Sequence, residues 1–245
     1  MIHATKGIVL RSISYGDTSI ISSVYTELFG LQHYLVKGIR KTSRKSVNKS
    51  ACFQPGAMVE LVVYHNEQKQ LQYVREVHWS YLYTSVFSEV IKNTVALFMV
   101  ELLQHSLQQP ESNPDLFYFV ERSLQELDKG TDGVTANLPL LFSLQLAVLL
   151  GFQLQGTYST IFNVLDLQEG QFVSEQPVHP FFIEGDAASI TARLYQITAY
   201  EQLENIQLHS TRRRELLENY LQFYALHIHD FVPLRSLPVL KEVLQ

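Results

Sequence analysis

Cysteine is almost absent from this chain, which has one, Cys52, among 245 residues. A single thiol excludes an internal disulfide and a cysteine-rich zinc site. Long apolar runs are also missing, since the most apolar stretch, residues 138–152, is interrupted by polar residues and falls short of the roughly 20 residues that cross a bilayer. We therefore expect no membrane span. Without a secretory signal pattern near the N-terminus, a cytoplasmic protein is favoured.

Signatures of catalysis are missing too. The chain has no G-x-S-x-G, no H-E-x-x-H, no G-x-x-x-x-G-K-[ST] and no dinucleotide glycine fingerprint. We therefore predict a protein that is not an enzyme and has no cofactor. What the chain does have is 46% hydrophobic residues against 18% charged residues, which is enough apolar material for a folded core.

Charge is unevenly distributed along the chain. Residues 1–80 hold ten Lys and Arg against five Asp and Glu, a balance of +5, whereas the other 165 residues hold nine against nineteen, a balance of −10. Local fields, rather than the overall charge of −5, attract polyanions. The pattern predicts two domains with different partners, at residues 1–80 and 81–245.

The first domain has the pattern of a β protein. Short runs of β-branched and aromatic residues, separated by turn residues, predict five strands at residues 6–14, 19–26, 31–37, 57–65 and 71–78. Five short antiparallel strands favour a small barrel such as an OB-fold, with a small sandwich as the alternative. After residue 79 the apolar period becomes helical, so the fold class is α+β multidomain, a five-stranded barrel followed by an all-helical domain.

Helix boundaries in the second domain follow from proline, glycine and capping residues. The first helix ends before Pro110, and the second begins with Asn113 as cap and Pro114 at the first position. Further helices are predicted at residues 139–151, with Pro139 at the first position, and at 186–200, 210–229 and 237–244. The helical pattern lapses at about residues 153–184, where residues 166–172 predict a hairpin.

The segment at residues 37–49 is the strongest local feature. It places six cations in 13 residues, and no acid occurs between Glu27 and Glu60. Flexible cations on a barrel rim can follow a phosphate backbone, although a solvated surface loop is the alternative. The predicted DNA-binding residues here are Lys37, Arg40, Lys41, Arg44, Lys45 and Lys49.

Aromatic side chains near this segment are candidates for stacking on bases. By position they are Tyr15, His33, Tyr34, Tyr64, Tyr73 and Trp79, of which Tyr15 and His33 are the preferred choices. Because side chains alternate along a strand, about half of these should point into the barrel and pack in its core.

The helical domain carries one run of cations, Arg212, Arg213 and Arg214, at the start of the helix predicted at 210–229. Clustered arginines suit carboxylates, so a pocket for an acidic peptide is one interpretation. The alternative is a solvated helix face, on which Glu215 and Glu218 pair with these arginines.

Four stretches of this chain resemble the bacterial DNA repair and recombination mediator family RecO. The first stretch, residues 5–17, contains Thr5-Lys6-Gly7-Ile8-Val9-Leu10-Arg11 and Tyr15-Gly16-Asp17. The second, residues 37–56, contains Lys37-Gly38-Ile39-Arg40-Lys41, Ser43-Arg44 and Phe53-Gln54-Pro55-Gly56, and the third is Leu149-Leu150-Gly151-Phe152. The fourth, residues 213–244, contains Leu216-Leu217 and Tyr224-Ala225-Leu226-His227-Ile228. They occur in the family's order over nearly the whole chain, and the last is similar to shorter, Bacteroidetes-like members.

The resemblance implies a protein that binds single- and double-stranded DNA, anneals complementary strands and helps load the recombinase onto strands covered by single-strand-binding protein. It implies two protein partners, the mediator RecR and the acidic, apolar C-terminal tail of single-strand-binding protein, and a nucleoid-associated place in the cytoplasm. Arg212, Arg213 and Arg214 are the candidate receptor for that tail.

The chain departs from many family members in one region. A four-cysteine zinc site often follows the motif matched by Gly151-Phe152, but residues 154–182 contain no cysteine. We predict no metal, and a degenerate zinc-finger-like insertion at about 153–184 that is held by apolar anchors such as Phe162, Leu165, Leu167 and Phe172.

Two other functions remain open on the sequence. One is a protein-interaction adaptor whose basic barrel docks an acidic partner without touching DNA. The other is a hydrolase that uses scattered His, Asp and Glu residues. A salt series of DNA affinities separates the adaptor from the DNA-binding mediator, because counterion release makes DNA binding fall steeply with salt.

Overall fold

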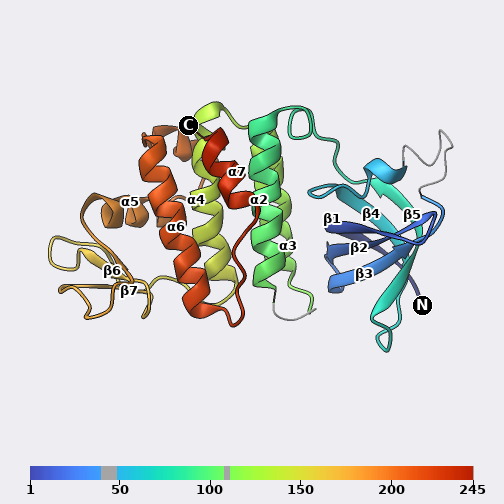
Figure 1. Cartoon of the computed structure of the whole chain (residues 1–245), viewed down its shortest axis with the longest axis horizontal. Coiled ribbons are helices and arrows are strands. Elements are labelled where there is room, and N and C mark those ends of the chain that lie inside the picture. Colours follow the sequence, from blue (N-terminus) through green and yellow to red (C-terminus); the bar gives the residue numbers. More distant parts are fainter. Residues whose placement is uncertain (40–48, 108–110, 245) are drawn as a thin grey trace. The chain divides into compact units, whose positions relative to one another are not determined.

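The computed structural model describes residues 1–39, 49–107 and 111–244. It divides into two compact units, one of Met1–Thr84 with Leu107–Gln125, the other of Ser85–Ser106 with Glu126–Gln245 (Figure 1). The helix α3 therefore contributes to both units, with its last turn in the second. The predicted domain division after residue 80 stays a prediction.

The first unit contains the predicted five-stranded barrel. Its strands are β1 (Ile2–Tyr15), β2 (Ser19–Thr26), β3 (Gly30–Val36), β4 (Met58–Tyr64) and β5 (Leu71–Trp79). They close in the order β1-β2-β3-β5-β4, and every pairing is antiparallel except that of β3 with β5. The OB-like barrel is confirmed, and the sandwich alternative is wrong, because closure leaves no open sheet edge among these strands.

The strand β1 is longer than predicted because it pairs with two different strands. Its first half pairs with β4 from Ile2 onward, and its second half pairs with β2 as far as Tyr15, with a bulge between Val9 and Arg11. The strand thus belongs to both sides of the closed sheet. Close packing inside requires glycine at position 7, where an added Cβ would lie 2.6 Å from a methyl carbon of Val24.

The first part of α3 (Pro114–Lys129) packs on the barrel. Asn113 caps this helix as predicted, with its side chain accepting a hydrogen bond from the backbone N–H of Leu116 at 3.0 Å. The ammonium of Lys6 on β1 lies 3.1 Å from the carboxylate of Glu121. The rings of Tyr25 and Phe117, with centroids 6.1 Å apart, add a second contact between the barrel and α3 within the first unit.

The second unit is mostly helical. Besides the end of α3, its elements are α2 (Val90–Ser106), α4 (Asp132–Leu149), α5 (Gly185–Tyr195), η1 (Tyr200–Asn205), α6 (Ser210–His227), α7 (Ser236–Val243) and the short strands β6 (Val164–Asp166), β7 (Gln171–Val173) and β8 (Phe182–Ile183). The helix α4 lies between α2 and α6 (Figure 1). It is long and apolar enough to cross a membrane by composition, yet 67% of it is buried inside the protein, as a core helix is.

Three predicted helix boundaries are wrong. The helix α4 begins at Asp132, with Thr131 as its cap, so Pro139 lies inside the helix rather than at its first position. The apolar side chains on both sides of this proline are buried, which offsets the roughly 3 kcal/mol that an internal proline costs. The helix α5 ends at Tyr195, five residues early, before the 3-10 turn η1, and α6 ends at His227 rather than residue 229.

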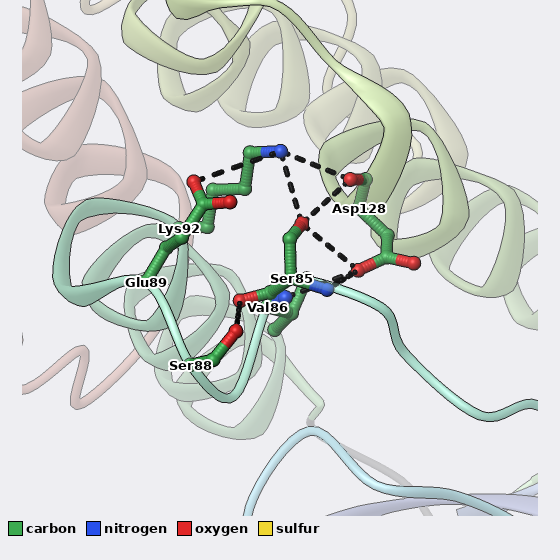
Figure 2. Close-up of polar contacts among 6 residues, drawn as sticks. All are labelled: Ser85, Val86, Ser88, Glu89, Lys92 and Asp128. Atoms are coloured by element: carbon green, nitrogen blue, oxygen red, sulfur yellow. Dashed lines mark hydrogen bonds and ion pairs between the residues drawn. The ribbon is translucent and has the colours of Figure 1, made fainter.

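A buried carboxylate fixes the start of the second unit (Figure 2). The Oδ1 atom of Asp128 accepts hydrogen bonds from the backbone N–H groups of Ser85 and Val86 at 2.8 and 3.0 Å and from the Ser85 hydroxyl at 3.1 Å. The ammonium of Lys92 donates to the Asp128 carbonyl at 2.9 Å and to the Ser85 hydroxyl at 3.0 Å. Because Asp128 and Lys92 are both buried, this network holds the turn before α2 against the end of α3.

Candidate nucleic-acid interface

The outer face of the barrel brings together three of the predicted DNA-binding residues. Tyr15 ends β1 and pairs with Ser19, while the next residue of β2 pairs with Val36 at the end of β3. The tip of the β1–β2 hairpin therefore lies beside the point where Lys37 follows β3. Tyr15, His33 and Lys37 are all exposed; His33 lies on β3, and Lys37 is the first residue after that strand.

A groove opens where β3 leaves the sheet. The pairing of β3 with β5 covers only His33–Leu35 against Leu71–Tyr73, and beyond it the two segments separate around a cavity of about 290 Å³. Among the described residues, three cations line this groove, which we call the β3–β5 groove. They are Lys37, Lys49 and Arg75.

Two cations of the groove have different partners. The ammonium of Lys37 lies 5.1 Å from the ring centroid of Tyr73, a cation–π contact that holds this charge at the groove wall. Arg75 pairs with Glu76 at 3.3 Å, but both side chains are half exposed, and such surface pairs contribute about 1 kcal/mol or less. A phosphate group could therefore replace Glu76 as the partner of Arg75 at little cost.

Four of the predicted DNA-binding residues, Arg40, Lys41, Arg44 and Lys45, lie outside the described residues. Both flanks of their segment line the β3–β5 groove, because Ile39 and Lys49 belong to its wall. The chain thus enters and leaves the basic segment at this groove.

The aromatic candidates divide as strand alternation predicts. Tyr34 is fully buried in the barrel, so its candidacy as a base-stacking residue is wrong. Tyr64 and Tyr73 are exposed and face each other across the β4–β5 pair. The hydroxyl of Ser23 lies 2.9 Å from the Nδ1 atom of His33, so the imidazole is held on the outer face of the sheet.

The three arginines of α6 point to different surroundings. Arg212 pairs with Glu215 at 2.8 Å, as the solvated-face alternative predicted. The Nε of Arg213 donates to the Asn137 side chain at 3.0 Å, and burial lowers the pKa of Arg213. Arg214 lines a small apolar cavity of about 10 Å³, and its buried Nε has no hydrogen-bond partner among the described residues. They do not form a single cluster. The cavity is walled by Ala136, Pro139, Leu140, Arg213, Arg214, Leu217, Leu240, Lys241 and Leu244.

The insertion forms a three-stranded sheet in the order β7-β6-β8, which includes the predicted hairpin. Leu165, Leu167 and Phe172 are buried anchors, but Phe162 is 48% exposed, so its assignment as an anchor is wrong. A polar contact adds to them, since the buried carboxylate of Asp166 lies 3.3 Å from the Nε2 atom of His179. This pair was not predicted from the sequence, because its members are separated by twelve residues and no local pattern links them.

We expect the insertion to keep its structure without zinc. The described residues contain no group of three or more His, Cys, Asp and Glu side chains that could hold a metal ion. Addition of a strong chelator should therefore leave the melting temperature unchanged, whereas Asp166→Ala should lower it, because Asp166 also accepts hydrogen bonds from the backbone N–H groups of Gln168 and Glu169. Stoichiometric zinc by elemental analysis, with a chelator-dependent melting temperature, would contradict this expectation.

Comparison with known proteins places the chain in a family. "Recombination protein O N terminal" matches residues 1–83, and "Recombination protein O C terminal" matches residues 88–238. The chain belongs to the RecO family. Among curated RecO proteins, "DNA repair protein RecO" of Christiangramia forsetii is 34% identical over 245 residues, and those of Azobacteroides pseudotrichonymphae and Bacteroides fragilis are 31% and 32% identical over 243 and 244 residues. In all three cases the match covers 99% of both chains.

RecO membership confirms the resemblance found in the sequence, including its Bacteroidetes-like character. It supports a role in DNA repair and recombination. The OB-like barrel coincides with the N-terminal RecO match, so the predicted fold and the family agree.

Proposed function

We propose that this protein is a DNA-binding recombination mediator that anneals complementary strands and helps load the recombinase onto DNA covered by single-strand-binding protein. One observation carries the proposal: the β3–β5 groove gathers Lys37, Lys49 and Arg75 at both ends of the basic segment. OB-folds bind oligonucleotides on the face of their second and third strands and at adjoining loops. Lys37 directly follows β3, and Arg75 lies on β5, the strand that pairs with β3.

The proposed mechanism is electrostatic and needs no catalytic group. Two DNA strands repel each other through their phosphates, and annealing becomes faster when cations on a protein neutralise part of that charge. Single- and double-stranded DNA would both bind, since both present phosphates. The proposed protein partners are RecR and the tail of single-strand-binding protein, and the proposed location is the cytoplasm, at the nucleoid.

The groove is tested by removing its charges. We expect the variant Lys37→Gln, Lys49→Gln, Arg75→Gln to bind DNA more weakly at low salt, and to lower the slope of log affinity against log salt by about 2 to 3, because three phosphate contacts are lost. Fluorescence anisotropy of labelled single strands and duplexes between 50 and 200 mM salt measures both quantities.

The same titration decides between DNA binding and the adaptor alternative. A mediator that contacts DNA through this groove gives a steep salt dependence in the wild type and a shallower one in the variant. Wild-type protein that binds neither single strands nor duplexes at 50 mM salt would contradict the proposal and favour the adaptor.

For the tail of single-strand-binding protein, we propose a receptor around Arg214 rather than the whole arginine run. Support comes from the unpartnered Nε of Arg214, which lies beside an apolar cavity formed by α4, α6 and α7. A peptide carboxylate would supply the missing hydrogen bond. The cavity of about 10 Å³ accepts no side chain as it stands, so binding requires Leu240 or Leu244 to move.

This receptor predicts different effects for neighbouring arginines. Arg214→Ala should weaken binding of a labelled tail peptide by at least about tenfold, since a hydrogen bond to a charged group contributes about 1.5 to 3 kcal/mol. Arg212→Ala is the matched control and should change binding less than twofold, because Arg212 pairs with Glu215. Equal binding of both variants and the wild type in an anisotropy titration would show that the receptor lies elsewhere.

A further inference from the structure

A row of exposed apolar side chains crosses three strands of the barrel next to the β3–β5 groove. Ile2 on β1 pairs with Tyr64 on β4, and Tyr64 pairs with Tyr73 on β5. Residues paired across neighbouring strands point to the same face of a sheet, so these three side chains form a continuous row. Their exposed fractions are 51%, 48% and 39%, which places the row on the outer surface of the barrel unit.

The register extends this row beyond β5. Tyr73 pairs with Leu35 on β3, which pairs with Ile21 on β2, which in turn pairs with Ile13 on β1. Of these side chains Ile13 is exposed, whereas Leu35 is buried, so the exposed row itself consists of Ile2, Tyr64 and Tyr73. Tyr73 itself lines the β3–β5 groove, and Tyr64 is its partner on β4, so the two tyrosines lie beside the groove cations.

The surroundings of the tyrosines indicate the partner. Lys37 lies over the Tyr73 ring, and Lys49 and Arg75 line the same groove, so the side of the row toward β3 carries positive charge. An apolar protein segment would gain nothing from these cations, whereas a nucleic acid strand presents both anionic phosphates and flat base faces. Charge complementarity thus favours a nucleic acid with unpaired bases.

We propose that Tyr64 and Tyr73 form a base-stacking platform that gives this surface a preference for single-stranded over duplex DNA. The proposal rests on the DNA-binding function proposed above and adds the form of DNA. In a duplex the base faces are already stacked on one another, so a duplex makes only the phosphate contacts of the groove. An unpaired strand makes these contacts and also stacks on the tyrosine rings.

The test separates ring stacking from apolar contact and from charge. The double variant Tyr64→Leu, Tyr73→Leu keeps apolar side chains but removes both rings, and Tyr64→Phe, Tyr73→Phe keeps the rings as the matched control. Affinities are measured by anisotropy for a thymidine 20-mer, for a strand of the same length made of abasic sites, and for a 20-base-pair duplex. Circular dichroism and the fluorescence of Trp79 check that both variants are folded.

We expect the leucine variant to lose at least about tenfold in affinity for the thymidine strand and less than twofold for the duplex, and the phenylalanine variant to match the wild type. The wild type should bind the abasic strand about as weakly as the leucine variant binds the thymidine strand. An equal loss for single strand and duplex, or no loss, overturns the platform. Wild-type protein that binds none of the three DNA forms overturns the proposed function instead, so the two failures are distinguishable.

Discussion

Asp128→Ala is expected to destabilise the helical unit by roughly 3 kcal/mol, because it leaves buried hydrogen-bond donors without their acceptor. The carboxylate of Asp128 accepts from the backbone N–H groups of Ser85 and Val86, and the Val86 contact is fully buried. Water cannot replace the lost acceptor at a residue that is 3% exposed. The substitution also removes a negative charge from the surroundings of the buried Lys92 ammonium (Figure 2).

Urea unfolding followed by two probes measures this effect. Far-ultraviolet circular dichroism reports mainly the helices, while the fluorescence of Trp79, the single tryptophan, reports the barrel unit. Asp128→Asn is the matched variant and should lose less stability, because its side-chain oxygen can still accept from both N–H groups. Glu175→Gln, at an exposed position of the helical unit, is a surface control, expected within about 0.5 kcal/mol of the wild type. An unchanged circular dichroism midpoint in Asp128→Ala would refute the structural role of this carboxylate.

Local patterns in the sequence were sufficient to predict the strands and the cap of α3. Alternating β-branched and aromatic residues set the five strands, and Asn113 followed by Pro114 set the start of the helix. They failed where distant contacts decide. The internal position of Pro139 depends on burial of its neighbours against other helices, and the extension of β1 to Ile2 depends on pairing with β4, more than fifty residues away.

The candidate interface was only partly visible in the sequence for the same reason. The cations at residues 37–49 are evident from composition alone, but Arg75 joins Lys37 only through the pairing of β3 with β5. The choice between Tyr34 and Tyr73 depends on which strand face points outward, and a shift of one residue reverses it. The divergence of the arginines on α6 follows from tertiary partners such as Asn137, which no local pattern reveals.

Charge reversal of the basic segment is expected to have the largest effect on DNA binding. The variant Arg40→Glu, Lys41→Glu, Arg44→Glu, Lys45→Glu removes four cations whose segment begins and ends at the β3–β5 groove. If each of them neutralises one phosphate, the slope of log affinity against log salt falls by roughly 3 to 4. Affinity at 50 mM salt should fall more than hundredfold, since the new carboxylates also repel the backbone. Salt-series anisotropy with a duplex and a single strand measures both.

The matched control reverses cations elsewhere. Lys129→Glu, Arg193→Glu, Arg235→Glu changes three exposed residues of the helical unit and makes the overall charge more negative by six, against eight for the basic segment. If net charge alone governed binding, this control would lose nearly as much affinity as the segment variant, because long-range repulsion depends on total charge. If the phosphates lie at the groove, the control keeps the wild-type salt slope, since no phosphate contact is removed. An unchanged slope in the segment variant would instead show that DNA does not follow residues 40–45.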